Sequence, residues 1–166
     1  MVKSVKKSEI SILDLSGREI LKYKSPTNLD HQQLLQKAVI HAAENRIPLN
    51  NANLKGIVLN NADISGLVLD GADLSDGIIK GSNLDNVSLL RANASQTKII
   101  NTCMERSYLD GCAFNFSVFH KVNAARSSII STSFYGAQIR ASNLSRCQAL
   151  VGLTSFEGAF VQNTSL

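Results

Sequence analysis

The sequence predicts an all-β solenoid of about six coils, with a β-hairpin and an α-helix at its N-terminal end. An apolar residue recurs at every fifth position from Leu49 to Ala149 without a polar exception. The residue two positions earlier is nearly always small, and the other three positions are mostly polar or glycine. A period of five fits neither an α-helix, which repeats at about 3.6 residues, nor a simple strand, which repeats at about 2.

Residues 1–46 lack this repeat, and we interpret them as a separate cap domain. Residues 10–15 and 18–23 are β-like, and Ser16-Gly17 between them is a two-residue hairpin signal. Hairpin and helix together are expected to cover the apolar end that the first coil of a solenoid exposes. A partner-binding head is the alternative role, and the two roles can coexist.

The predicted helix follows Pro26. Thr27 or Asn28 can cap it, and it is expected to run to about Asn45. One stripe of this segment is apolar, which is typical of a helix that packs on a core. The stripe consists of Leu34, Leu35, Ala38, Val39, Ala42 and Ala43.

The solenoid domain is expected to span residues 47–166. Residues two apart in an extended chain point to the same side, so the apolar centre and the small residue before it both point inward. Ile47, Ile57 and Leu67 are large at the small position, where the cap could accommodate their volume. After Ala149 the repeat resumes two residues late, which predicts a two-residue bulge near 149–151. Coils spaced by about 4.8 Å give a rod roughly 30 Å long.

Three early repeats carry a family resemblance. Ala52-Asn53-Leu54-Lys55-Gly56, Ala62-Asp63-Ile64-Ser65-Gly66 and Ala72-Asp73-Leu74-Ser75-Asp76 resemble the A-(D/N)-L-x-x repeat of the pentapeptide-repeat family. The resemblance extends over about residues 47–166. It implies a right-handed, four-sided β-helix with four pentapeptides per coil, so that residues 20 apart stack. Phe114 and Phe134 are therefore expected to stack in adjacent coils.

Composition and motifs point away from catalysis. Apolar residues make up 44% and charged residues 18% of the 166 residues, which is typical of a folded domain. The sequence contains neither a phosphate-binding glycine loop nor an HExxH motif, and its three histidines and three cysteines lack metal-ligand spacing. No enzymatic activity, cofactor or metal is expected. The absence of a signal-peptide pattern and of a long apolar run predicts a cytoplasmic protein with reduced thiols and no membrane contact.

Charge is distributed unevenly along the chain. Residues 47–86 carry two basic and five acidic side chains, whereas residues 87–166 carry seven basic and three acidic ones. With a coil of 20 residues, Arg106, Arg126 and Arg146 form one outward column. His120 and Arg140 form a neighbouring one, and Lys98 and Lys121 lie close by. We interpret these residues as a candidate surface for an anion or an acidic partner. The alternative is an ordinary solvated face.

A second candidate surface is apolar. Val58, Ile78 and Val118 occupy outward positions where other repeats have Asn or Asp, and Ile100 lies beside them. Outward aliphatic residues in one column form a patch that can mark a contact site. Singly scattered apolar residues, which are normal on a monomer, are the alternative.

These features favour a rigid protein-interaction module that binds or inhibits a macromolecular partner. The family resemblance implies an alternative, since some pentapeptide-repeat proteins mimic DNA, bind DNA gyrase and protect it from quinolones or toxins. That role needs a strongly negative face, which the net charge of +4 opposes. A phage-type inhibitor of host machinery is a further alternative. Direct nucleic-acid binding is not expected, because no aromatic residues alternate with the basic column.

The last coil predicts an assembly contact. The repeat runs to Leu166, which is itself an expected inward centre, as are Phe156 and Val161. An open coil with such residues exposes unpaired backbone groups and apolar side chains. A homodimer through the C-terminal coil is the simplest way to cover them, and the resemblance to family members that dimerise end to end supports it.

Overall fold

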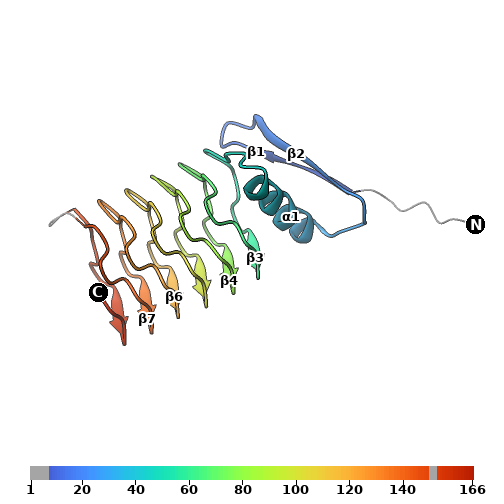
Figure 1. The fold of residues 1–166 in the computed structure, drawn as a ribbon. Helices are drawn as coiled ribbons and strands as arrows, with labels where there is room; N and C mark the ends of the chain where they lie inside the picture. The colour runs from blue at the N-terminus through green and yellow to red at the C-terminus, as the bar shows by residue number, and fades with distance from the viewer. Residues whose placement is uncertain (1–7, 150–152) are drawn as a thin grey trace, which may run out of the picture.

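The structure is a computed structural model that describes residues 8–149 and 153–166. It is a rod in which coils are stacked side by side, with a hairpin and a helix at one end (Figure 1). One side of the rod is a parallel sheet with the strand order β3-β4-β5-β6-β7-β8. The elements are β1 (Ser8–Leu13), β2 (Glu19–Ser25), α1 (His31–Glu44), β3 (Val58–Asn60), β4 (Ile78–Lys80), β5 (Lys98–Ile100), β6 (Val118–His120), β7 (Gln138–Arg140) and β8 (Phe160–Gln162).

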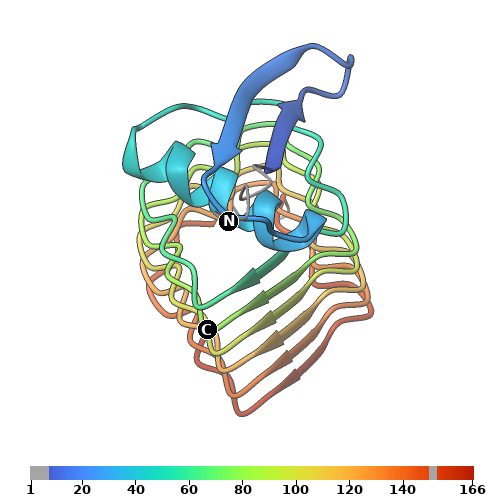
Figure 2. The same ribbon diagram turned by 90° about the vertical axis from the view of Figure 1, so that its right-hand side faces the viewer.

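The coils have four sides, which Figure 2 shows along the rod. We call these sides faces A to D. In the coil that starts at β3, residues 57–60 form face A, 62–65 face B, 67–70 face C and 72–75 face D. Residues 20 apart pair as parallel neighbours, as Val58 does with Ile78 on face A and Asp63 does with Asn83 on face B, so the coil holds four pentapeptides. The predicted four-sided β-solenoid is confirmed.

The predicted centres form the core of the solenoid. Leu74, Leu84 and Phe114 are buried, as the five-residue register requires, whereas Arg126 is exposed. Each buried centre lies directly above the centre of the preceding coil, because the backbone hydrogen bonds join residues one coil apart. The interior is therefore a continuous apolar column along the rod, and burial of this column is the main source of stability.

Buried hydroxyl groups at the small position bond to the backbone. Ser107 Oγ donates to the Leu84 carbonyl oxygen at 3.0 Å, and Thr132 Oγ1 donates to that of Leu109 at 2.7 Å. Within the described residues, every buried side-chain nitrogen or oxygen has a hydrogen-bond partner. Serine and threonine can therefore replace alanine at this position without the cost of an unsatisfied buried polar group.

The corners between faces require a left-handed backbone. Gly66 and Gly71 have φ values of 70° and 69°, as predicted for glycine at a corner. Asn61 and Asp76 adopt the same conformation at the other two corners of this coil, with φ values of 49° and 60°. Asparagine and aspartate tolerate this region better than most residues, which explains their frequency there.

An aromatic stack runs through the last coils. The ring centroids of Phe114 and Phe134 are 5.5 Å apart and the planes are nearly parallel, which confirms the predicted stacking. Phe156 continues the stack, at 4.8 Å from Phe134. Gln138 pairs with Phe160, so this step between coils is two residues longer than the others. The predicted bulge falls largely on residues 150–152, which lie outside the described residues.

The N-terminal segment forms the predicted hairpin and helix with shifted boundaries. The strands β1 and β2 are antiparallel, but residues 14–18 connect them, so the loop is longer than the predicted two-residue turn. The helix α1 begins after Asp30 rather than after Thr27 or Asn28. Asp30 accepts a hydrogen bond from the Gln33 backbone N–H at 2.8 Å and forms a capping box with that residue, which fixes the start of the helix.

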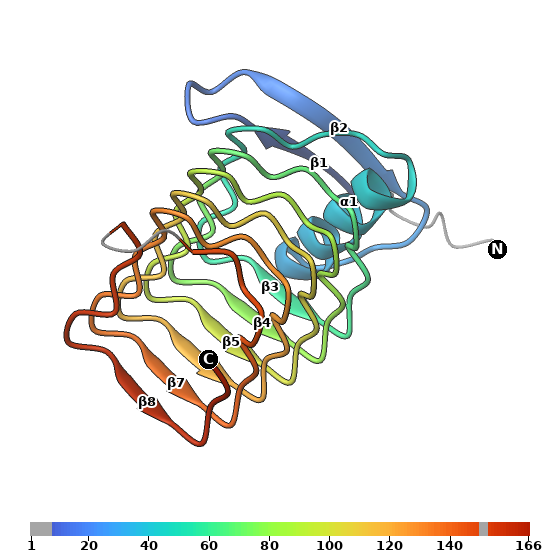
Figure 3. The ribbon, with the colours of Figure 1, turned by 60° about the vertical axis from the view of Figure 1, so that its left-hand side comes forward.

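The helix covers the open edge of the first strand, as Figure 3 illustrates. Gln36 Oε1 accepts from the Asn60 backbone N–H at 3.0 Å, and Gln36 Nε2 donates to the Asn60 carbonyl oxygen at 3.1 Å. Gln32 makes the equivalent pair of contacts with the Val58 N–H and the Gly56 carbonyl. Two side-chain amides thus satisfy backbone groups of β3 that would otherwise be open to edge pairing.

The hairpin covers a second part of the first coil. The Leu15 N–H donates to the Asn51 carbonyl at 2.9 Å, and the Asn53 N–H donates to that of Leu13 at 2.8 Å. Asp14 organises the hairpin loop, where it accepts from the Ser16 hydroxyl and from the Arg18 backbone N–H. These hydrogen bonds, led by that of Ser16, hold the pKa of the Asp14 carboxyl well below its usual value.

Candidate interaction surface

Face A presents two outward columns of side chains on strands β3 to β8. The strand register pairs each residue with its counterpart in the next coil. The first column contains Val58, Ile78, Lys98, Val118, Gln138 and Phe160, and the second contains Asn60, Lys80, Ile100, His120, Arg140 and Gln162. The sequence therefore folds its basic and apolar candidates onto one flat parallel sheet.

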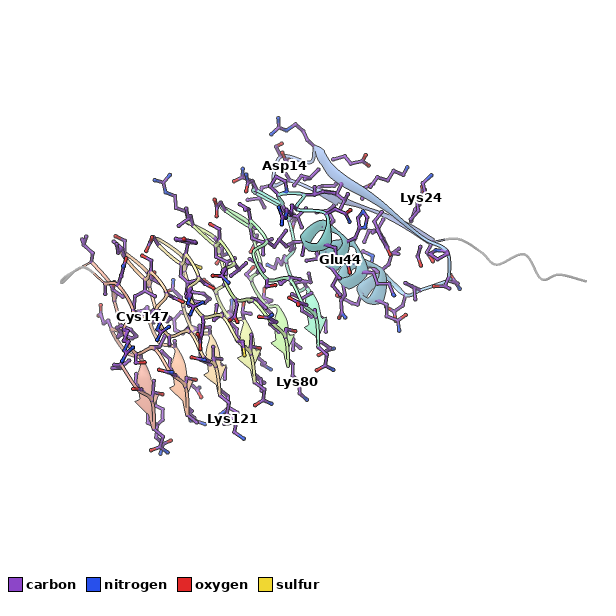
Figure 4. The ribbon with its side chains drawn as sticks, viewed as in Figure 1. Asp14, Lys24, Glu44, Lys80, Lys121 and Cys147 are labelled. Atoms are coloured by element: carbon purple, nitrogen blue, oxygen red, sulfur yellow. The ribbon has the colours of Figure 1, made fainter. Side chains whose placement is uncertain are left out.

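The charge of face A has a single sign. Its six described strands contain Lys80, Lys98, His120 and Arg140 but no aspartate or glutamate. Lys121 follows at the corner towards face B, and Figure 4 shows Lys80 and Lys121 pointing away from the rod. Within residues 8–149 and 153–166, none of these side chains forms an ion pair. The positive charge of face A is thus uncompensated.

The apolar column is shorter than the sequence predicts. Lys98 lies between Ile78 and Val118 in the strand register, so the predicted patch is divided into two parts. Ile78 is 39% exposed, whereas Val58 and Val118 are half-buried. The interpretation as one contiguous patch is wrong, because the coil of 20 residues places a lysine in the middle of the column. Face A is a mixed basic and apolar surface.

The arginine column forms a separate surface. Arg106, Arg126 and Arg146 occupy the corner between faces B and C, with φ values of 53°, 62° and 59°. The Asn123–Asn143 column of face B lies between them and the His120–Arg140 column. A hollow of about 290 Å³ at this corner is lined by Arg126, Arg146 and, among others, Glu105. The structure therefore does not bring the arginine column and the histidine column together.

The remaining polar groups have structural roles. A hollow of about 820 Å³ over the corner between faces C and D includes Asp70 and Asp110 in its lining. Each of these carboxylates accepts a serine hydroxyl and a backbone N–H of the next coil. No three His, Cys, Asp or Glu side chains of the described part of the chain are arranged to hold a metal ion. Its single helix is too short to cross a membrane.

The cysteines do not form a reactive site. Cys112 is buried, Cys147 is half-buried and Cys103 is exposed, and all three are free thiols. Burial raises the pKa of the Cys112 and Cys147 thiols, which disfavours the thiolate form. Cys112 is therefore a core residue, as its inward register position predicts.

The last described coil leaves an open edge. Strand β8 pairs with β7 alone. Val161 is 38% and Leu166 is 70% exposed, whereas Phe156 is half-buried beneath its contact with Phe134. Phe156, which we expected to be exposed with Val161, is thus largely covered by the aromatic stack. Arg140 lies over the Phe160 ring, with its guanidinium carbon 5.2 Å from the ring centroid.

Two exposed aromatic residues are missing from the sequence-based candidates. Phe116 and Tyr135 lie in contact at the corner between faces D and A. They are 19 residues apart, and in a coil of 20 residues such positions are diagonal neighbours. The spacing was therefore a signal that could have identified the pair once the length of the coil was known.

Comparisons with known proteins agree with this architecture. The family model for pentapeptide repeats matches residues 49–76. A trypsin-treated form of QnrB1, described as a plasmid-mediated fluoroquinolone resistance protein, is similar with a TM-score of 0.65 and 15% identity. The similarity covers 70% of this chain and 58% of the QnrB1 chain, which is less than two-thirds of its length. No curated protein matches the sequence.

A second solved structure shares the fold. The pentapeptide-repeat protein Rfr23 from the cyanobacterium Cyanothece 51142 has a TM-score of 0.51 and 15% identity, covering 78% of this chain and 93% of its own. At this level of identity the two structures support the fold alone. The matched repeats and the same five-residue register in the coils that follow them show that the chain belongs to the pentapeptide-repeat family.

Proposed function

We propose that the protein is a non-catalytic interaction module whose face A binds an acidic surface of a macromolecular partner. Residues 1–46 act as the cap domain and residues 47–166 as the interaction domain. The observation that carries this proposal is the single sign of the charge on face A, where lysine, histidine and arginine side chains lie beside exposed aliphatic ones. Complementary charge steers association and selects partners, and a rigid sheet loses little entropy on binding.

The gyrase-binding alternative has less support. A DNA mimic needs a continuous negative surface, but the acidic residues of the solenoid are concentrated in its early coils and face A has none. The fold shared with QnrB1, a fluoroquinolone resistance protein, keeps this role as a second candidate. A supercoiling assay with purified gyrase tests it directly. Protection from a quinolone by the wild-type chain would favour this second candidate over binding through face A.

Charge reversal on face A tests the main proposal. The double variant Lys98→Glu/Arg140→Glu is expected to lose most partner capture from a bacterial lysate, because both side chains are exposed at the centre of the basic surface. Arg91→Glu, at the exposed corner between faces C and D, is the matched control and should retain capture. Quantitative mass spectrometry of the bound proteins provides the readout. Equal capture by all three proteins would contradict the proposal.

We also propose that two copies pair through the last coil. The open edge of β8 and the exposed Val161 and Leu166 side chains support this, since one edge can serve both chains of a two-fold dimer. Light scattering at micromolar concentration is expected to give twice the chain mass of 17.9 kDa. Val161→Asp should yield a monomer with the early coils still folded. A monomer mass for the unmodified chain would refute the dimer.

A further inference from the structure

The surface at the corner between faces D and A carries an aromatic pair. Phe116 is 59% exposed and Tyr135 is 44% exposed. Their ring centroids are 5.4 Å apart and the ring planes are nearly perpendicular. Large aromatic side chains with much of their area in water are typical of protein contact sites, because they bury a large area at low entropic cost when a partner covers them.

Phe116 occupies a backbone position that suits other residues better. Its φ is 56°, in the left-handed region that favours glycine and asparagine. Among the described non-glycine residues with positive φ, it is the one large apolar side chain. The next residue of the same corner is Gly136, where an added Cβ would lie 2.7 Å from the Phe116 ring. Glycine at 136 thus makes room for a ring that the local backbone itself does not favour.

The pair is continuous with face A. Val118 follows Phe116 by two residues at the start of β6, and Phe160 is 50% exposed on β8 of the same face. Lys98, His120 and Arg140 supply the positive charge beside these apolar groups. The corner and the face therefore combine an aromatic anchor with a basic surface.

We propose that Phe116 and Tyr135 form the anchor site for an apolar side chain of a protein segment whose acidic residues lie on face A. This inference rests on the proposed function, and it names the chemistry of the partner. A nucleic acid fits less well, because Glu157 lies one coil beyond Tyr135 and would repel a phosphate backbone that crosses the pair. One side of the Phe116 ring also lies against Gly136, which limits base stacking.

The probe is a library of random peptides displayed on phage, selected against the immobilised full chain. Enriched peptides are expected to combine an aromatic or aliphatic residue with several acidic ones. Fluorescence anisotropy then gives their affinity for the wild type and for Phe116→Asn, Tyr135→Ser and Lys98→Glu/Arg140→Glu. Each anchor variant should weaken binding by about tenfold or more, as truncation of an aromatic hot spot does. The control Tyr108→Ser removes a 56% exposed aromatic side chain on face C and should leave binding unchanged.

The Phe116→Asn variant separates binding from folding. Asparagine suits the left-handed backbone, so the variant should melt at the same temperature as the wild type or higher while it loses the peptide. Enriched peptides that depend on Lys98 and Arg140 but not on Phe116 would overturn the anchor and leave the proposed function in place. Peptides that depend on neither surface would overturn both.

Two further outcomes also contradict the anchor. Failure to enrich any peptide on the wild-type chain would remove the inferred partner class. Binding of a labelled single-stranded oligonucleotide that Phe116→Asn abolishes would assign the aromatic pair to nucleic acid instead, since base stacking on aromatic rings produces that dependence.

Discussion

Replacing Phe134 by alanine is expected to lower the free energy of unfolding by about 3–5 kcal/mol, the range found for large-to-small substitutions in a core. The Phe134 ring is fully buried and stacks between Phe114, at 5.5 Å, and Phe156, at 4.8 Å. Phe119 contacts it edge-on at 5.8 Å. Removal of the ring therefore leaves a cavity lined by three aromatic side chains that the stacked coils hold in place.

Urea denaturation followed by far-UV circular dichroism measures this effect, and thermal melting should show a decrease of about 6–20 °C for a chain of this size. Tyr108→Ala, which removes an exposed aromatic side chain, is the control and should change the stability by less than about 1 kcal/mol. A loss for Phe134→Ala no larger than that of the control would mean that the rings do not stack in the interior.

The five-residue register predicts the core of the solenoid because one physical rule acts in every coil. Each centre must be apolar, since it faces only other centres, and each small position must fit beside a corner. The burial of Leu74, Leu84 and Phe114 follows from this rule alone. The neighbours of each side chain on the surface follow only once the length of the coil is fixed. That length places Lys98 between Ile78 and Val118, where the sequence analysis predicted one patch.

The cap was less predictable, for two different reasons. The start of the helix was encoded in the sequence, because Asp30 and Gln33 have the spacing of a capping box, but Thr27 and Asn28 offered competing signals. The contacts of Gln32 and Gln36 with β3 were not encoded locally. A polar side chain on a helix surface does not reveal which backbone edge it will meet, since that depends on how the helix docks.

Replacing Gly77 by valine is expected to destabilise the protein by about 1–3 kcal/mol through overpacking. Gly77 occupies the small position of face A, one coil after Ile57, which is large for that position. An added Cβ would lie 2.8 Å from the Leu74 carbonyl oxygen and 3.5 Å from Ile57 Cγ2. Thr97, nearly the same shape as valine, is buried at the equivalent position of the next coil, so the fold accepts this volume where Ile57 is not adjacent.

A double-mutant cycle with Ile57→Ala tests the crowding between these two residues. Ile57→Ala alone should lower the free energy of unfolding by about 2–5 kcal/mol as a cavity substitution. In the double variant the valine fills part of that cavity, so the combined loss should be smaller than the sum of the single losses by about 1–2 kcal/mol. Urea titrations of the four proteins give this coupling energy. Additive losses would show that Gly77 is required by its own backbone contacts with the Leu74 carbonyl, and not by the size of Ile57.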